Sequence, residues 1–226
     1  GLYLQYQPIL DLKSGRISGF EALARLKSDK LGFVPPLEFI PIGKKIILQA
    51  LGFIGRLKAA GRADLTVSVN VSAIQVLAND FKEDLFKMID EMNVSPKNLG
   101  IEITESVFTS DYSVINCILG ELREKGMIIA IDDFGTGYSS FAREQELNVD
   151  CLKIDKYFID KLLEVDSDKA ITAEIISIAH KMGHYVIAEG VEHEEQKEYL
   201  LKNGCEKIQG YLAARPLDED EAIKKL

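Results

Sequence analysis

Two adjacent carboxylates near the middle of the chain follow a short apolar run and could bind a metal ion. The run is 128–131, Asp132 and Asp133 come directly after it, and a loop with Gly135 and Gly137 follows. Carboxylates at the end of a buried strand are costly to keep charged unless a cation neutralises them. Mg²⁺ or Mn²⁺, which prefer oxygen ligands, would do so. The alternative is that the pair only begins a turn and caps the next helix.

Polar side chains also end most of the other strand-like runs. These residues are Glu21, Asn70, Glu102, Glu105, Lys153, Glu189, Glu192 and Gln209. Each one alone has a structural interpretation, as a turn residue, a strand-edge carboxylate or, for Lys153, an ion pair with Asp155. In a parallel barrel, however, the carboxyl ends of the strands converge on one face, where active sites lie. Carboxylates gathered there predict two divalent ions, which can bind the attacking and leaving oxygens of a phosphoryl displacement.

Strand-like and helix-like segments alternate along the whole chain. The strand-like runs lie at 2–10, 17–23, 66–71, 99–104, 128–131, 151–154, 185–188 and 207–209. Helical periodicity occupies 46–60, 81–92, 113–125, 170–182 and 194–203. Sustained alternation indicates an α/β protein with a parallel sheet, and about eight strands favour a closed barrel. We therefore predict a single domain over residues 1–226, a (β/α)8 TIM-type barrel. The opening hairpin predicts that its first strand is antiparallel to the others.

Composition and charge exclude several classes of protein. The 226 residues carry a net charge of −9 without a basic stripe, which argues against binding of a nucleic acid polymer. Cys117, Cys151 and Cys205 form no CxxC pair, which argues against a disulfide framework or structural zinc and favours the cytoplasm. No apolar run is long enough to span a membrane and no signal peptide opens the chain, so we expect no membrane contact by this domain.

Several segments together resemble a known family. They are the Glu21-Ala22-Leu23 motif within 19–25, and the segments 7–9, 70–73, 102–106, 132–140, 152–155, 188–192 and 209–211. With these segments the chain resembles an EAL domain, the bacterial cyclic-di-GMP phosphodiesterase module, over essentially its whole length. The resemblance implies a (β/α)8-type barrel that opens cyclic-di-GMP to linear pGpG.

The resemblance also implies a set of metal ligands. Two divalent cations, Mg²⁺ or Mn²⁺, are expected, whereas Ca²⁺ would bind and inhibit because its looser coordination positions water poorly. The first cation would be held by Glu21, Asn70, Glu102 and Asp132. Asp132 would bridge to the second cation, which Asp133 would complete, with Glu189 near the metal-bound water.

Catalytic and substrate-binding roles follow from the same resemblance. Lys153 would steer or polarise the attacking water, and its charge suits the developing phosphorane. Glu105 would stabilise the loop 133–140, which shapes the second metal site. Gln7 would contact a guanine edge and Arg25 a phosphate, as suits a guanidinium. Glu192 and Gln209 would support the site through hydrogen bonds.

The chain departs from the family pattern at three places. The join at 41–43 is shorter than usual, and it is either a deletion or a longer loop that is missing from the chain as given. Residues 142–145 are less apolar than in the family and lie next to the loop that often carries the dimer contact, which puts dimerisation in doubt. Leu26 replaces a common tryptophan, which predicts weaker base stacking.

We predict a metal-dependent phosphodiesterase that hydrolyses cyclic-di-GMP in bacterial second-messenger signalling. The alternative is a catalytically inactive receptor that binds cyclic-di-GMP, but such relatives usually lack a metal ligand, the lysine or the loop-stabilising glutamate, and none is missing here. A third possibility is a phosphodiesterase for another dinucleotide. The resemblance implies a homodimer, because members of the family commonly dimerise. We also expect a tethered sensory or GGDEF-type domain, because Gly1 leads straight into a strand-like segment as if an upstream domain had been cut away. A membrane-anchored parent protein would also place this domain in the cytoplasm.

Overall fold

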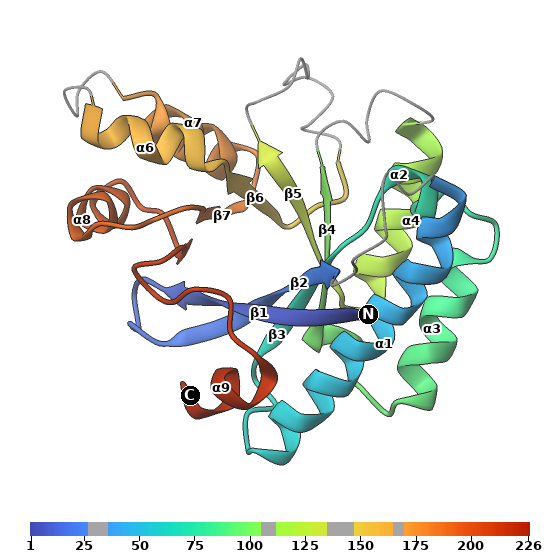
Figure 1. Ribbon diagram of the computed structural model, residues 1–226. Helices are drawn as coiled ribbons and strands as arrows, with labels where there is room; N and C mark the ends of the chain where they lie inside the picture. Colours follow the sequence, from blue (N-terminus) through green and yellow to red (C-terminus); the bar gives the residue numbers. More distant parts are fainter. Residues whose placement is uncertain (27–35, 105–111, 135–146, 165–169) are drawn as a thin grey trace.

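Eight strands form a closed barrel in the order in which they occur in the chain (Figure 1). The computed structural model describes residues 1–26, 36–104, 112–134, 147–164 and 170–226, with the backbone alone at 26 and 36–41. The strands are β1 (Leu2–Asp11), β2 (Ile17–Leu26), β3 (Thr66–Asn70), β4 (Leu99–Thr104), β5 (Ile128–Phe134), β6 (Cys151–Ile154), β7 (Tyr185–Ala188) and β8 (Lys207–Gln209). β1 pairs antiparallel with both β2 and β8, and all other neighbours are parallel. The predicted barrel with an antiparallel first strand is confirmed.

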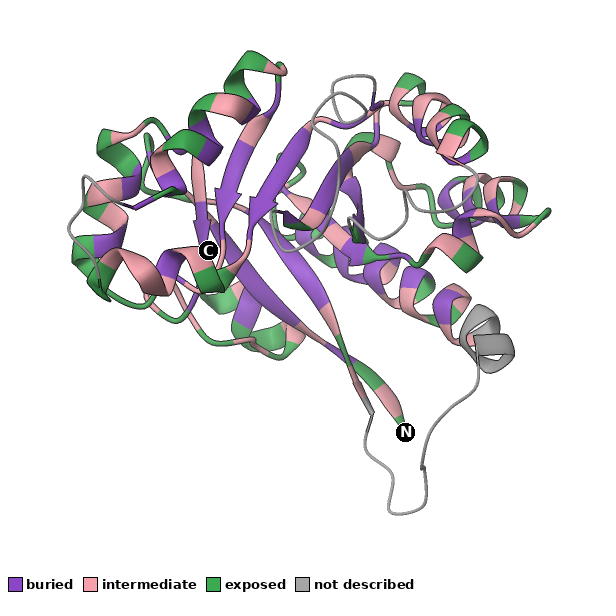
Figure 2. Cartoon of the chain, turned by 90° about the horizontal axis from the view of Figure 1, so that it is seen from above, coloured by how far each residue is buried: buried purple, intermediate pink, exposed green. Residues whose placement is uncertain are grey.

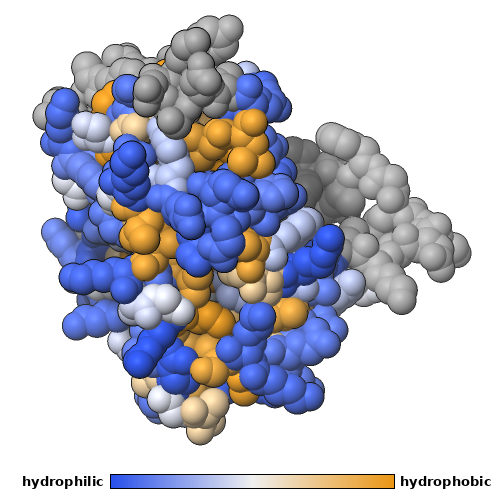
Figure 3. Space-filling model, turned by 90° about the vertical axis from the view of Figure 1, so that its left-hand side faces the viewer, coloured by the Kyte–Doolittle hydropathy of each residue, from blue (hydrophilic) through white to orange (hydrophobic). Residues whose placement is uncertain are grey.

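Helices cover the outside of the barrel. They are α1 (Pro36–Ala59), α2 (Ala73–Val76), α3 (Phe81–Glu91), α4 (Tyr112–Glu124), α6 (Lys156–Glu164), α7 (Thr172–Lys181), α8 (Glu194–Lys202) and α9 (Glu219–Lys224), with a 3₁₀ turn, η1 (Pro96–Asn98). In Figure 1, α1, α3 and α4 lie on the right of the strands, and α6, α7 and α8 lie on the left. The left-hand face is mostly hydrophilic with smaller apolar patches (Figure 3). No helix in the described part of the chain is both long and apolar enough to cross a membrane.

The sequence predicts the strands better than the helices. β4, β6, β7 and β8 begin and end where expected, whereas α1 begins ten residues before the predicted start at 46, at Pro36. Proline is favoured in the first turn of a helix, where its missing N–H is not needed. The short join at 41–43 therefore lies within a helix. The short helices α2, α6 and α9 were not predicted, because so few turns give little periodic signal.

A small apolar cluster lies inside the barrel, below the carboxyl ends of the parallel strands. It consists of Ile9, Ala130, Cys151 and Ile187, from four different strands, and it is separate from the main core. Purple, buried strands dominate the centre of Figure 2. Residues two apart share one face of a strand. The interior positions that follow Ala130, Cys151 and Ile187 are therefore Asp132, Lys153 and Glu189, so a charged layer lies directly above the apolar one.

Phe53 connects α1 to the first hairpin, and its removal is expected to destabilise the whole barrel. Its ring is fully buried and stacks on Tyr6 at 3.8 Å between centroids, with Phe20 edge-on at 5.5 Å. Phe53→Ala should lower the free energy of unfolding by about 3–5 kcal/mol in a urea titration. Leu48→Ala, at a side chain of the same helix that is 40% exposed, is the control. A loss for Phe53→Ala no larger than that of the control would contradict this account.

Candidate metal centre

The carboxyl ends of the strands bring the predicted polar residues to one end of the barrel. Strand register places Asn70 opposite Glu102, and Thr104 opposite Asp132. Gln7 lies opposite Glu21 on the first hairpin. The side chains of Gln7, Glu21, Glu102, Lys153 and Gln209 are all buried. A barrel interior this polar is costly unless its charges and hydrogen bonds are matched.

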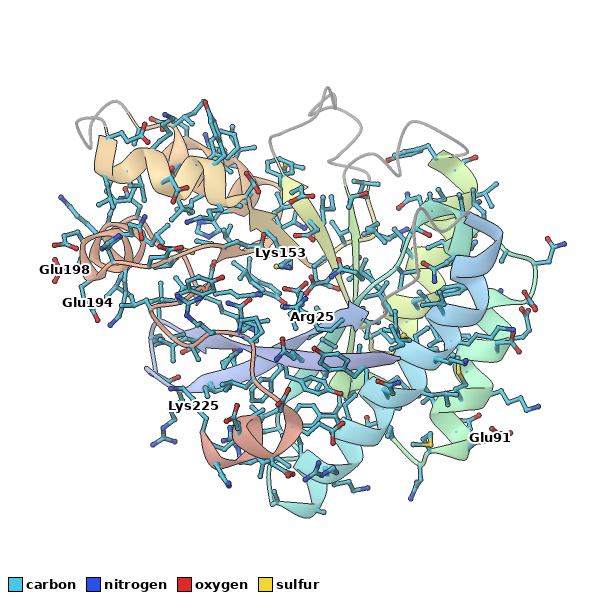
Figure 4. The ribbon with its side chains drawn as sticks, in the orientation of Figure 1. Arg25, Glu91, Lys153, Glu194, Glu198 and Lys225 are labelled. Carbon is cyan, nitrogen blue, oxygen red and sulfur yellow. The ribbon has the colours of Figure 1, made fainter. Side chains whose placement is uncertain are left out.

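Lys153 lies at the centre of this cluster, and its side chain is fully buried. Its Nζ atom is 2.5 Å from Glu102 Oε2 and 2.7 Å from Glu189 Oε1. It is also 3.3 Å from Asp132 Oδ1 and 3.5 Å from Glu21 Oε2. Figure 4 shows Lys153 near the middle of the molecule, inside the ring of elements. Four carboxylates from four different strand ends therefore share one ammonium.

Two amide side chains orient Glu21. Asn70 Nδ2 donates to Glu21 Oε1 at 2.7 Å, and Gln209 Nε2 donates to Glu21 Oε2 at 2.5 Å. Gln209 Nε2 also lies 3.3 Å from Gln7 Oε1, and Gln7 Nε2 donates to the Ala214 carbonyl at 3.3 Å. Both oxygens of Glu21 are therefore fixed in direction before any ligand arrives.

An irregularity in β5 brings two consecutive carboxylates to the same end of the barrel. The pairing of β5 with β6 shifts register between Ile131 and Phe134, and Asp133 has a φ of 55°. Regular alternation would send neighbouring side chains to opposite faces, whereas a bulge re-aims them. Oxygens of Asp132, Asp133 and Glu189 accordingly lie within 4.8 Å of one another. A positive φ is uncommon for aspartate, and a strained conformation of this kind is typical of functional sites.

The cluster contains more carboxyl groups than the single charge of Lys153 can neutralise. Burial raises the pKa of Glu102 to about 8 and that of Glu189 to about 7, although Lys153 acts in the opposite direction on both. Burial also raises the pKa of Glu21, but Lys153 and the two amide hydrogen bonds more than offset it and leave that pKa below its usual value. For Lys153 itself, burial lowers the pKa, but the carboxylates outweigh this effect and keep the pKa well above normal. The lysine is therefore charged, and the cluster has capacity for further cations.

The donor atoms of the cluster fit a divalent metal. Oxygens of Glu21, Glu102 and Asp132 lie within 4.8 Å of one another, and Asp132 belongs to the second group with Asp133 and Glu189 as well. Glu102 Oε1 is buried and has no hydrogen-bond partner among the described residues. Carboxylate oxygens are the ligands that Mg²⁺, Mn²⁺ and Ca²⁺ prefer. Two groups that share one aspartate are the arrangement expected for a pair of ions.

Other predicted site residues lie at the edge of the cluster or outside the described residues. Arg25 Nε donates to Gln5 Oε1 at 3.0 Å, and the exposed Glu192 forms an ion pair with Lys156 at 3.0 Å. Glu105 and residues 142–145 lie outside the described residues.

Two positioning residues were missed by sequence reasoning. Gln5 holds Arg25, and Lys156 holds Glu192. The role of Gln5 could have been predicted from the hairpin, because Gln5 lies two residues before Gln7 on β1. The pairing of β1 with β2 places Gln5 opposite Leu23, near Arg25. Lys156 is 36 residues from Glu192, and no local pattern connects the two.

The fold and the charged cluster define the class of this protein. It is a TIM-type barrel with a carboxylate-rich site, suited to divalent metal ions, at the carboxyl ends of its strands. The sequence profile of the EAL domain matches residues 1–216. The chain belongs to the EAL domain family, as the sequence predicted.

Two relatives from Pseudomonas aeruginosa illustrate the similarity. A protein named cyclic di-GMP phosphodiesterase is 34% identical over 227 residues, which cover 96% of this chain and 38% of that protein. MucR, named bifunctional diguanylate cyclase/cyclic di-GMP phosphodiesterase, is 32% identical over 98% of this chain and 34% of its own length. The chain thus spans little more than a third of either relative.

Solved structures show the same barrel. The PaMucR phosphodiesterase in complex with c-di-GMP has a TM-score of 0.87 and 33% identity, covering 98% of this chain and 94% of that chain. BlrP1 of Klebsiella pneumoniae, in a complex with manganese and cyclic di-GMP, has a TM-score of 0.83 and 25% identity, covering 96% and 56%. A complex of BlrP1 with calcium matches equally well.

Proposed function

We propose that this chain hydrolyses cyclic di-GMP to linear pGpG with two bound divalent cations. The observation that carries the proposal is the convergence of Glu21, Glu102, Asp132 and Glu189 on Lys153 at the carboxyl end of the barrel. The names of the relatives support the choice of substrate. Because the chain corresponds to only part of those relatives, the proposal concerns the hydrolytic step and not its regulation.

The cations would be Mg²⁺ or Mn²⁺, held by two overlapping sets of residues. One set is Glu21, Asn70, Glu102 and Asp132, and the other is Asp132, Asp133 and Glu189. When bound, such cations neutralise phosphate charge and lower the pKa of a coordinated water towards neutrality. The manganese complex of BlrP1, which has the same fold, supports this assignment.

Lys153 and Glu189 would act directly on the reacting groups. Both side chains lie at the same end of the barrel, and both would act on the attacking water. Glu189 would accept a proton from that water. The fixed charge of Lys153 would stabilise the negative charge that develops on the phosphorane.

The substrate would bind over the cluster through Gln7, Arg25, Glu192 and Gln209. Gln7, which accepts a hydrogen bond from Gln209 beside Glu21, would contact a guanine edge. Arg25 donates a hydrogen bond to Gln5, and its guanidinium is suited to bind a phosphate. Glu105 would stabilise the loop after Asp133.

Calcium is expected to support binding but not turnover. Carboxylate oxygens accept Ca²⁺, but its longer and less regular coordination would leave the attacking water poorly aligned with Lys153 and Glu189. Replacing Mg²⁺ with Ca²⁺ should therefore reduce pGpG formation to background while cyclic di-GMP still binds in equilibrium dialysis. Turnover with Ca²⁺ at the rate seen with Mg²⁺ would contradict the proposed arrangement.

A combined turnover and binding assay separates the enzyme from its alternatives. The purified chain is incubated with Mg²⁺ or Mn²⁺ and cyclic di-GMP, cyclic di-AMP or linear pGpG, and the products are separated by chromatography. Conversion of cyclic di-GMP alone supports the proposal. Tight binding of cyclic di-GMP without conversion indicates a receptor, and faster conversion of another dinucleotide indicates a different substrate.

The cellular setting is proposed from the sequence and the relatives. We infer a cytoplasmic domain of a larger signalling protein, with a sensory or GGDEF-type domain attached. The name of MucR, which combines both activities in one chain, supports this view. A homodimer is also proposed, and light scattering on the purified chain tests it.

A further inference from the structure

Lys153 contacts the same carboxylate side chains that a divalent ion would need. Its ammonium approaches Glu102 Oε2 and Glu189 Oε1 within 2.7 Å, and Asp132 Oδ1 at 3.3 Å. Glu21 Oε2 is the fourth oxygen, at 3.5 Å. An ammonium has only three N–H donors, so it cannot satisfy four acceptors, and Asp132 Oδ1 has no hydrogen-bond partner among the described residues.

Both potential metal sites are involved. All three members of the first group, Glu21, Glu102 and Asp132, contact the ammonium, and so do two members of the second, Asp132 and Glu189. The lysine is therefore not beside the metal-binding groups but between them.

Metal binding and the present lysine contacts exclude each other on electrostatic grounds. A divalent ion takes carboxylate oxygens at about 2.0–2.6 Å, which would place it close to the ammonium that these carboxylates now surround. Two cations that share the same oxygens in a buried site repel strongly, because water does not screen them there. The ammonium must then move away from at least part of the cluster.

We infer that Lys153 is an internal cation that competes with divalent metal for the carboxylates, so that metal binding displaces its ammonium. The inference builds on the proposed function, since it concerns the same site. In the metal-free protein, Lys153 holds the four carboxylates together and preserves the site. In the loaded protein the same lysine is released towards the substrate. The lysine therefore lowers the affinity for metal as it preserves the geometry of the site.

Mn²⁺ binding tests this inference without substrate. Chelator-treated wild type and Lys153→Met, which keeps the length of the side chain without its charge, are titrated with Mn²⁺, and the free ion is measured by electron paramagnetic resonance. Lys153→Met should bind Mn²⁺ about tenfold more tightly or better, because a competing charge is gone. Lys82→Met is the matched control, since Lys82 on α3 forms an ion pair 2.6 Å long with Glu121 on α4. The Mn²⁺ affinity of this variant should equal that of wild type. Equal or weaker Mn²⁺ binding by Lys153→Met would overturn the inference.

Thermal unfolding gives a second readout. Without metal, Lys153→Met should melt about 5 °C or more below wild type, because four buried carboxylates lose their counter-ion. Saturating Mn²⁺ should close this gap. A gap that persists with Mn²⁺, or no gap without it, would contradict the role of Lys153 as an internal cation.

A measurement on the wild type alone decides the matter if the variant does not fold without metal. Crystal structures with and without Mn²⁺ should show the separation of Lys153 Nζ from Glu102 Oε2 increase from 2.5 Å to beyond hydrogen-bond distance. An unchanged separation with bound Mn²⁺ would overturn the inference. Failure of the proposed function is distinguishable, because it would appear as absent pGpG formation while Mn²⁺ still displaced the lysine.

Discussion

Glu21→Ala should remove at least 99% of the cyclic di-GMP turnover of the wild type. Glu21 contributes an oxygen to the potential metal site that it forms with Glu102 and Asp132. Asn70 and Gln209 orient its carboxylate from two sides. Its loss would weaken binding of one ion, which supplies several kcal/mol of transition-state stabilisation, and each 1.4 kcal/mol is worth about tenfold in rate. The measurement is pGpG formation at saturating Mg²⁺, with Glu198→Ala, at an exposed carboxylate on α8 (Figure 4), as the control.

Asp132→Asn extends the same argument to both groups. Asparagine has nearly the volume of aspartate but no negative charge, and Asp132 is the residue that the two groups share. Turnover should fall at least as far as in Glu21→Ala, and Mn²⁺ stoichiometry should fall with it. Retention of most activity in either variant would show that the central carboxylates do not hold a catalytic ion.

Lys153→Ala should lower kcat far more than it raises KM. The ammonium is buried beneath the proposed substrate, and its charge matters most when negative charge develops on the phosphorane. Removal of one such preorganised group typically costs about 10²–10³ in rate, and a loss in kcat with little change in KM marks an interaction of the transition state. Steady-state kinetics over a range of cyclic di-GMP concentrations separate the two constants.

The metal concentration must be saturating in that experiment. Because Lys153 is expected to compete with metal, the variant should need less Mg²⁺ for half-maximal activity even as its kcat falls. Full kcat in Lys153→Ala would show that the lysine acts only in assembling the site. A raised KM with unchanged kcat would assign it to substrate binding instead.

The barrel was predictable from sequence because strand-like and helix-like segments alternate along the whole chain. Short strands such as Cys151–Ile154 and Tyr185–Ala188 are apolar runs between polar segments, and the structure reproduces their bounds. The antiparallel start was predictable because a turn at residues 13–16 separates two strand-like runs too closely for a crossover helix. The start of α1 at Pro36 was not predicted, because Pro41 and Gly43, residue types that usually interrupt a helix, lie in its first turns.

The membership of the charged cluster was predictable, but its internal contacts were not. Glu21, Glu102, Asp132, Lys153 and Glu189 all follow from the rule that strand ends converge. Lys153 was given Asp155 as an alternative partner, two residues away, whereas its four partners in the structure lie 21 to 132 residues away in sequence. Such distances leave no local pattern. The bulge at Asp133 was likewise not predicted, because the Asp-Asp pair does not by itself show which residue breaks the alternation.

Metal-dependent turnover of cyclic di-GMP by the purified chain is the measurement that tests the central claim most directly. Wild type and Glu21→Ala are assayed side by side with Mg²⁺, with Mn²⁺ and with chelator. The account predicts pGpG from the wild type with either metal, none with chelator, recovery when metal is returned, and almost none from Glu21→Ala. Turnover that persists in chelator, or that Glu21→Ala retains in full, would contradict it.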